Sequence, residues 1–188
     1  MINAKVMQAI DKLEAFQKDR DDSWNIPREE GLILHNIVLA GGCRLLVEVG
    51  TSYGFSGLFL GSAAQANGGR LHTFDLDPRK HEHAAKNFES AGLGDSIELH
   101  LGDARQRLAE LPDGIDFAFL DATKTETAAY WDLLEGKLSE RCIVTVDNVT
   151  THPDELGGFL ASLRERADFT CATVTVGNGF DLAVRIRK

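Results

Sequence analysis

The pattern of apolar and polar residues changes at Leu45. From there on, short apolar runs alternate with longer segments in which apolar residues recur at helical spacing. Such alternation is typical of a sheet with helices packed on its faces. The pattern predicts seven strands, at 45–49, 71–75, 97–101, 115–120, 142–147, 170–176 and 180–186. It predicts helices between them at 55–67, 78–91, 103–111, 126–138 and 153–166.

The connections between these elements indicate how the sheet is wound. Asp77 followed by Pro78 is a typical helix start, and the residues before Pro153 look similar. The last two strands are joined only by Gly177-Asn178-Gly179, a short link that favours a hairpin. We therefore expect an α/β fold with helices on both faces. Five strands should be parallel, and the carboxyl-terminal hairpin should be antiparallel.

Two further helices are predicted ahead of the first strand, at 3–19 and 28–41. The link at 21–27 is polar and ends in proline, so it is predicted to be a loop. The sequence shows neither an internal repeat nor a second boundary. It predicts a single domain over residues 1–188, in which 1–41 form a helical cover and 42–188 form the catalytic core.

Charge and composition narrow the classes of function. The 20 Lys and Arg residues against 29 Asp and Glu residues give a net charge of −9, which disfavours nucleic acid as the main partner. No apolar stretch approaches the ~18 residues of a membrane helix, and residues 1–20 are too polar for a signal peptide. The 3 cysteines are far apart and are expected to be reduced thiols. We expect a cytoplasmic protein with a small-molecule partner and no membrane partner.

Polar residues collect where the predicted strands end, which is where open α/β sheets bind ligands. Glycines and serines follow the first strand at Gly50, Ser52, Gly54, Ser56 and Gly57. Their spacing differs from the GxGxxG of dinucleotide-binding folds, and they form either a simple tight turn or a cradle for a ligand's polar tail. Asp75 ends the second strand, where it either opens a surface turn or accepts hydrogen bonds from two ribose hydroxyls. Both features together favour a nucleoside without a large phosphate group, and S-adenosylmethionine fits that description.

Three oxygen-bearing side chains end two other apolar strands. Asp121 follows FAFL, and Asp147-Asn148 follow CIVTV. Oxygen donors without a neighbouring Cys or His suit a hard cation such as Mg²⁺. Any one of them could instead cap the next helix or turn, but three at adjacent strand ends favour a cation site. Lys124 is either a solvated lysine or, beside a cation, a general base.

These motifs, in this order, resemble those of the cation-dependent small-molecule O-methyltransferases. That family contains catechol O-methyltransferase, the caffeoyl-CoA O-methyltransferases and many small bacterial relatives. The resemblance covers nearly the whole chain through IPREEGLIL, VEVGTSYGFSG, FDLDP, LGDA, FLDATK, VDNV and GNGFDLAVRIRK. It implies a Rossmann-like class I methyltransferase fold with a seven-stranded, mostly parallel sheet. We also expect a homodimer.

The resemblance implies a role for each residue of the site. Asp121, Asp147 and Asn148 match the family's ligands for Mg²⁺ or another divalent cation such as Mn²⁺ or Ca²⁺, and Lys124 matches its general base. Asp75 would hold the ribose hydroxyls. The implied cofactor-binding residues are Ile26, Glu48, Gly50, Ser52, Ser56, Asp75, Gly102, Asp103, Ala104 and Asp121.

The function that follows is transfer of a methyl group from S-adenosylmethionine to a hydroxyl of a small catechol-like or hydroxylated aromatic molecule. The cation would lower the hydroxyl pKa, and Lys124 would accept the proton. Two alternatives stay open. One is a metal-independent methyltransferase acting on another small nucleophile, and the other is a non-catalytic S-adenosylmethionine-binding homodimeric module. A nicotinamide dehydrogenase is disfavoured because the dinucleotide fingerprint is absent.

Several other polar and aromatic residues receive structural interpretations. His72 and His100 lie within predicted strands and are expected to be structural, whereas His152 follows Asn148 and is the only histidine placed near enough to the proposed site to touch substrate. Trp24 and Trp131 either flank the mouth of the pocket or belong to the core or a dimer contact.

Overall fold

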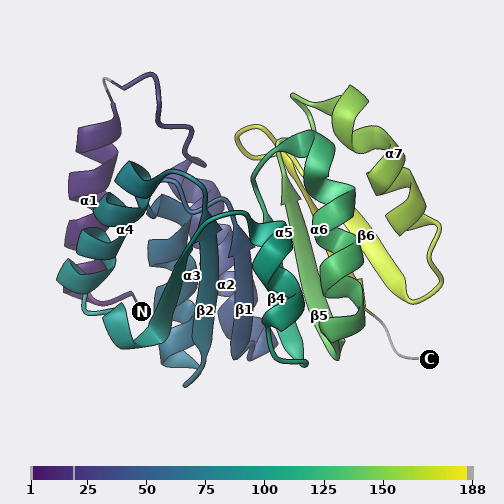
Figure 1. The fold of residues 1–188 in the computed structure, drawn as a ribbon, viewed down its shortest axis with the longest axis horizontal. Coiled ribbons are helices and arrows are strands. Elements are labelled where there is room, and N and C mark those ends of the chain that lie inside the picture. Colours follow the sequence, from purple (N-terminus) through teal and green to yellow (C-terminus); the bar gives the residue numbers. More distant parts are fainter. Residues whose placement is uncertain (1, 19, 186–188) are drawn as a thin grey trace.

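One mixed sheet organises the chain in a computed structural model that describes residues 2–18 and 20–185 (Figure 1). Its order is β3-β2-β1-β4-β5-β7-β6. The strands are β1 (Leu45–Val49), β2 (Arg70–Asp75), β3 (Ile97–Leu101), β4 (Ile115–Leu120), β5 (Leu138–Asp147), β6 (Phe169–Val174) and β7 (Phe180–Arg185). β1 to β5 pair in parallel, while β7 is antiparallel to both β5 and β6. The predicted mostly parallel sheet with an antiparallel carboxyl-terminal hairpin is confirmed.

Helices cover both faces of this sheet. They are α1 (Ala4–Gln17), α2 (Arg28–Gly41), α3 (Phe55–Ala66), α4 (Pro78–Ser90), α5 (Ala104–Arg107), α6 (Thr127–Leu134) and α7 (Pro153–Arg164). α1 to α4 share one hydrophobic core, and α5 to α7 share the core on the opposite face. The predicted start of α4 is confirmed, because the Asp77 side chain accepts a hydrogen bond from the backbone N–H of Arg79 and Pro78 opens the first turn.

The structure moves some predicted boundaries. β5 begins at Leu138 rather than at 142. The sequence pattern missed its first half because residues 139–141 are polar and the register with β4 shifts there. The predicted helices at 103–111 and 126–138 are shorter α-helices followed by 3₁₀ turns. Two predicted ends, residue 19 of the first helix and residue 186 of the last strand, lie outside the described residues.

The two amino-terminal helices are part of the main core. Ile10 of α1 and Leu34 of α2 are completely buried in the same cluster as Phe59 of α3. α2 packs closely on α3 at Gly31, where a Cβ would collide with the Phe59 ring. This packing fixes α2 over the sheet, and it carries one α2 side chain toward the candidate site.

Strand order reverses beside β1, which lies between β2 and β4. In open α/β sheets the crevice at the carboxyl ends of the strands on either side of such a point is the usual ligand site. Here those ends belong to β1, β2, β4 and β5, the strands that carry the residues singled out in the sequence. Among the described helices, none is both long and apolar enough to cross a membrane.

Candidate active site

A cavity of about 950 Å³ lies at this point of the sheet. Ten of the residues predicted from the sequence line it: Gly50, Ser52, Asp75, Gly102, Asp103, Ala104, Asp121, Lys124, Asp147 and Asn148. They come from the ends of five strands and the loops that follow them. The fold therefore gathers most of the expected cofactor residues and all the expected metal and base residues around one space.

Gly50 brings the two halves of the cavity together. Its φ is +111°, in the region that favours glycine, and a Cβ there would collide with the carbonyl oxygen of Asp121. The backbone N–H of Asp121 in turn donates a hydrogen bond to the carbonyl of Val49 at 2.9 Å. The turn after β1 thus lies directly against the end of β4, which places the expected cofactor and cation residues side by side.

The Asp75 carboxylate is fixed by the backbone around it. One oxygen accepts from the N–H of Ser52 at 2.6 Å, and the other accepts from the N–H of Asp77 at 2.8 Å. Ser52 adopts a left-handed φ of +48°, which aims its N–H at this carboxylate. A carboxylate offers about four lone-pair sites, so two remain for hydroxyls of a ligand in the cavity.

Three predicted cofactor residues lie outside the lining of the cavity. Ile26 is buried, and Glu48 and Ser56 bond to each other behind the wall, with Ser56 Oγ donating to Glu48 Oε1 at 2.5 Å. Thr73 Oγ1 donates to the other Glu48 oxygen at 2.5 Å. Successive side chains of a strand face opposite ways, so Glu48 points toward α3 while Val49 reaches the cavity. The cofactor contacts expected of these three residues stay predictions.

Glu48 makes the stability of the fold depend on pH. Burial raises its pKa from 4.5 to about 7, although the hydrogen bonds from Ser56 and Thr73 act in the opposite direction. The unfolded chain therefore ionises Glu48 well before the folded chain does. The stability that this group contributes is fully present below about pH 4.5 and is lost as the pH rises through about 7.

We expect Glu48→Gln to remove this part of the pH dependence. Between about pH 5 and about pH 8 the unmodified chain should lose roughly 3 kcal/mol more unfolding free energy than the variant. Urea unfolding of both proteins across that range, with divalent cations removed, measures the difference. Parallel curves for the two proteins would show that Glu48 titrates normally in the folded chain.

The residues predicted to bind the cation lie close to one another and to Lys124. Lys124 Nζ lies 2.7 Å from Asp121 Oδ1, and both side chains are nearly buried. Burial raises the pKa of Asp121 to about 7, and the charge of Asp147 adds to that rise while Lys124 opposes it. Burial also raises the pKa of Asp147, whose Oδ1 has no hydrogen-bond partner among the described residues.

Glu30 of α2 joins this group, although the sequence reasoning did not select it. The residue is completely buried, no N–H or hydroxyl group of the described residues donates to either of its carboxyl oxygens, and its carboxyl group meets that of Asp147. Burial and the charge of Asp147 raise its pKa to about 9. A signal was present in the sequence, because Glu30 shares a helical face with the apolar Leu34 and Val38, at intervals of four residues.

Trp24 and His152, whose roles the sequence left open, also line the cavity. Trp24 lies at the cavity with 81% of its surface exposed, and Lys80 Nζ lies 5.4 Å from the centre of its ring. Trp131, by contrast, belongs to the core against Phe159 and Phe169. The sequence left both tryptophans open between pocket and core, and the structure separates them. His152 also lines the cavity, as its position after Asn148 allowed.

The donor set suits a hard divalent cation. Three acidic side chains, those of Glu30, Asp121 and Asp147, lie with the Asn148 amide around one lysine, and their raised pKa values show that the place does not hold all three charges without a further cation. Buried carboxylates are stable only when they are protonated, paired or bound to metal. The buried carboxyl groups of Asp147 and Glu30, which meet each other and have oxygens that no N–H or hydroxyl donor reaches, are therefore the observation that fits a cation bound by oxygen ligands.

Comparisons with known proteins agree with this geometry. A family model described as a methyltransferase domain matches residues 47–149. Catechol O-methyltransferase of Mycobacterium tuberculosis is 31% identical over 164 residues, which cover 82% of this chain and 70% of that protein. Probable caffeoyl-CoA O-methyltransferase 2 of Dictyostelium discoideum is 31% identical over 111 residues, or 56% of this chain and 48% of that protein. The chain therefore matches about half the length of this second relative.

Solved structures show the same architecture. The O-methyltransferase TomG from Streptomyces achromogenes, solved in complex with SAM, has a TM-score of 0.82 and 26% identity, covering 98% of this chain and 91% of that one. The O-methyltransferase from Bacillus cereus, solved in complex with SAH, has a TM-score of 0.82 and 22% identity, covering 98% of this chain and 92% of that one. At 22% identity, the likeness to the Bacillus cereus enzyme shows a shared fold only.

Proposed function

This chain belongs to the cation-dependent O-methyltransferase family, whose members use S-adenosylmethionine, and from that premise we propose a specific reaction. The chain transfers the methyl group of S-adenosylmethionine to a hydroxyl of a small catechol-like or hydroxylated aromatic molecule, and it requires a divalent cation. The observation that carries this proposal is the single cavity in which Asp75 and the Gly50 turn lie beside Asp121, Asp147 and Asn148.

The cofactor half of the reaction rests on Asp75 and the turn after β1. Asp75 is held by two backbone N–H groups and has lone pairs left for the ribose hydroxyls of the cofactor. The turn at Gly50 and Ser52 lies between Asp75 and the end of β4, where the methionine portion of the cofactor fits. The complex of TomG with SAM supports this assignment for a relative with the same fold.

The acceptor half rests on Asp121, Asp147, Asn148 and Lys124. A divalent cation held by the first three would lower the pKa of a chelated hydroxyl. Lys124 Nζ lies 2.7 Å from Asp121 Oδ1, beside the place where the cation would be held, and in its neutral form it would accept the proton of that hydroxyl. The sulfonium already carries a good leaving group, so positioning of the two substrates in one cavity supplies most of the rate. The expected homodimer and cytoplasmic location stay predictions.

A methyl-transfer screen tests the proposal. Catechols, flavonoids and CoA-linked phenols are incubated with the chain and radiolabelled S-adenosylmethionine, with Mg²⁺ and with EDTA. We expect transfer to at least one hydroxylated aromatic that depends on Mg²⁺. Transfer that persists in EDTA would favour the metal-independent alternative. Cofactor binding in calorimetry with no transfer to any acceptor would favour the non-catalytic binding module.

Glu30 gives a prediction about cation binding itself. With Glu30→Gln we expect the affinity for Mg²⁺ to fall about tenfold or more, because a buried carboxylate next to Asp147 no longer balances the ion. Because the pKa of Glu30 is about 9 without a cation, binding near pH 7 should also release a proton that the variant cannot release. Calorimetry in two buffers of different ionisation enthalpy measures both quantities.

Glu29→Gln is the matched control. Glu29 precedes Glu30 on the same helix but is exposed, so the same loss of charge there should change neither the affinity nor the proton release. Equal effects of the two substitutions would mean that only long-range charge is involved. An unchanged affinity in Glu30→Gln would exclude Glu30 from the cation site.

A further inference from the structure

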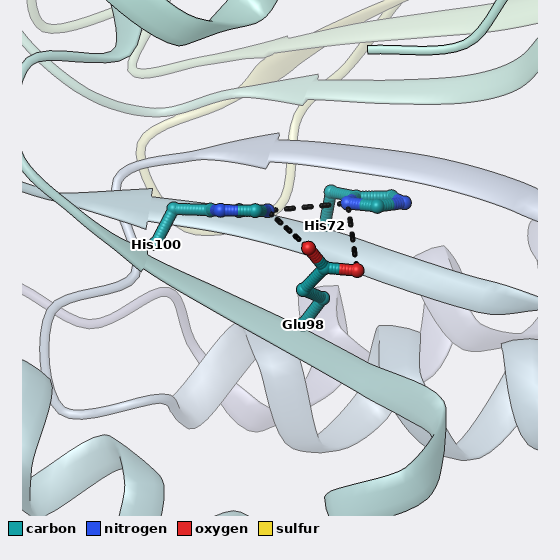
Figure 2. A group of neighbouring side chains, drawn as sticks. All are labelled: His72, Glu98 and His100. Carbon is teal, nitrogen blue, oxygen red and sulfur yellow. Dashed lines mark hydrogen bonds and ion pairs between the residues drawn. The ribbon is translucent and has the colours of Figure 1, made fainter. Parts of the chain in front are cut away.

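A second group of potential metal ligands lies on β2 and β3, and none of its members lines the cavity. His72 pairs with Glu98 across the two strands, and His100 pairs with Phe74 two positions further on. Because side chains two apart on a strand point to the same face, this register places all three polar side chains together. Figure 2 shows the two imidazole rings end to end, with the Glu98 carboxylate reaching toward both of them.

The potential ligand atoms of this group lie close together. His72 Nδ1 lies 3.1 Å from His100 Nε2. One Glu98 oxygen lies 3.7 Å from His72 Nδ1, and the other lies 3.7 Å from His100 Nε2. Tetrahedral zinc with bonds of about 2.0 to 2.2 Å separates its ligand atoms by roughly 3.3 to 3.6 Å. The spacing of these atoms is therefore within a few tenths of an ångström of that of zinc ligands, and a rotation of the two rings, whose nitrogens now face each other, would point both nitrogens at such an ion.

The surroundings keep the two imidazoles neutral, which is the form that binds a metal, and leave Glu98 open to an ion from solvent. Both rings are almost buried, at 8% and 6% exposure, and burial lowers the pKa of each, so they are neutral near pH 7. Glu98 lies on the edge strand β3, and 45% of its side chain is exposed. Arg70 contacts Glu98 at 3.3 Å, and this exposed ion pair can yield to a divalent cation.

We propose that His72, Glu98 and His100 bind a transition-metal ion of the Zn²⁺ class, at a site separate from the oxygen-ligand site in the cavity. Two imidazoles and one carboxylate are a donor set for Zn²⁺, whereas the cavity offers only oxygen donors of the kind Mg²⁺ prefers. Without the ion, one ring donates its N–H to the other. On binding, that proton moves to the other nitrogen of the same ring, so both facing nitrogens become ligands.

The site is connected to the cofactor cavity through one aromatic contact. The His100 ring is stacked on Phe74 with centroids 4.5 Å apart, and Phe74 lines the cavity immediately before Asp75. An ion that joins β2 to β3 therefore fixes the wall of the cavity next to Asp75, which is proposed to hold the ribose hydroxyls. The consequence is a structural role, in which metal binding raises thermal stability and pins the edge of the sheet.

Cobalt absorption tests the proposal directly. Co²⁺ is titrated into the full chain after EDTA treatment, in millimolar Mg²⁺ that occupies the oxygen-ligand site, and the visible bands of nitrogen-coordinated Co²⁺ are followed. Zn²⁺ should abolish these bands by displacement and raise the melting temperature. Because loss of an indirect partner of a metal already costs about 10-fold or more, His72→Gln and Glu98→Gln should each weaken binding at least that much.

Two further variants make the outcome decisive. Glu98 is exposed, so Glu98→Gln keeps the fold even if the buried histidine variant does not. His81→Gln removes a histidine of α4 outside the group and should leave binding unchanged. Bands that survive Glu98→Gln and His72→Gln but vanish in Asp147→Asn would place the ion in the cavity and overturn the proposal. Absence of bands and of any Zn²⁺-dependent stabilisation in the unmodified chain would overturn it as well.

Discussion

Replacing Lys124 by methionine is expected to lower the rate of methyl transfer about 100-fold or more, while the cofactor still binds. Lys124 Nζ lies 2.7 Å from Asp121 in a nearly buried position, and it is the only lysine that both lines the cavity and contacts a proposed cation ligand among the described residues. Methionine keeps the length of the side chain but cannot accept a proton. Single-turnover rates at saturating Mg²⁺, together with calorimetry of S-adenosylmethionine, separate the two effects.

Lys124→Arg distinguishes proton transfer from charge. Arginine can keep the ion pair with Asp121, but it stays protonated at every accessible pH and so cannot act as a base. We expect this variant to be nearly as slow as Lys124→Met. A rate in Lys124→Arg close to that of the unmodified chain would show that the positive charge, and not proton acceptance, is what Lys124 contributes.

Asp147→Asn is expected to weaken cation binding and to slow methyl transfer together. Asp147 is 2% exposed, its Oδ1 has no hydrogen-bond partner among the described residues, and Glu30 lies beside it. The substitution removes one of the negative charges that a cation would balance. We expect Mg²⁺ affinity to fall by more than about 100-fold, the upper end of what removal of an indirect partner costs.

The stability of this variant should move in the opposite direction. Without a cation, Asp147 is a buried carboxylate near Glu30 and Asp121, and its neutralisation relieves that repulsion. In EDTA the melting temperature of Asp147→Asn should therefore equal or exceed that of the unmodified chain. A large fall in melting temperature would mean that the lost activity comes from misfolding.

The sheet could be predicted because its strands are apolar runs that end in polar residues. The ends at Asp75, Asp121 and Asp147 are visible in the sequence, and parallel pairing then brings them to one edge. The first half of β5 could not be predicted, since its residues at 139–141 are polar and lie beside a register shift. Local pattern shows where a strand is buried, but not where an exposed part of it continues.

The site residues that could not be predicted from the sequence are brought into place by tertiary packing. Glu30 belongs to α2, which the sequence placed ahead of the sheet, and only the contact of α2 with α3 reveals that its carboxylate lies beside Asp147. His72 and His100 were expected to be structural because each lies inside a strand. Their meeting with Glu98 depends on the register of β2 against β3, which no sequence spacing specifies.

The cation dependence of methyl transfer is the central claim, and one rate measurement tests it most directly. The acceptor found in the screen is incubated with S-adenosylmethionine and the chain, first in EDTA and then after Mg²⁺ is restored. The account predicts that the rate falls to the uncatalysed level in EDTA, recovers with Mg²⁺, and does not recover in Asp147→Ala. Methyl transfer that continues unchanged in EDTA and in Asp147→Ala would contradict it.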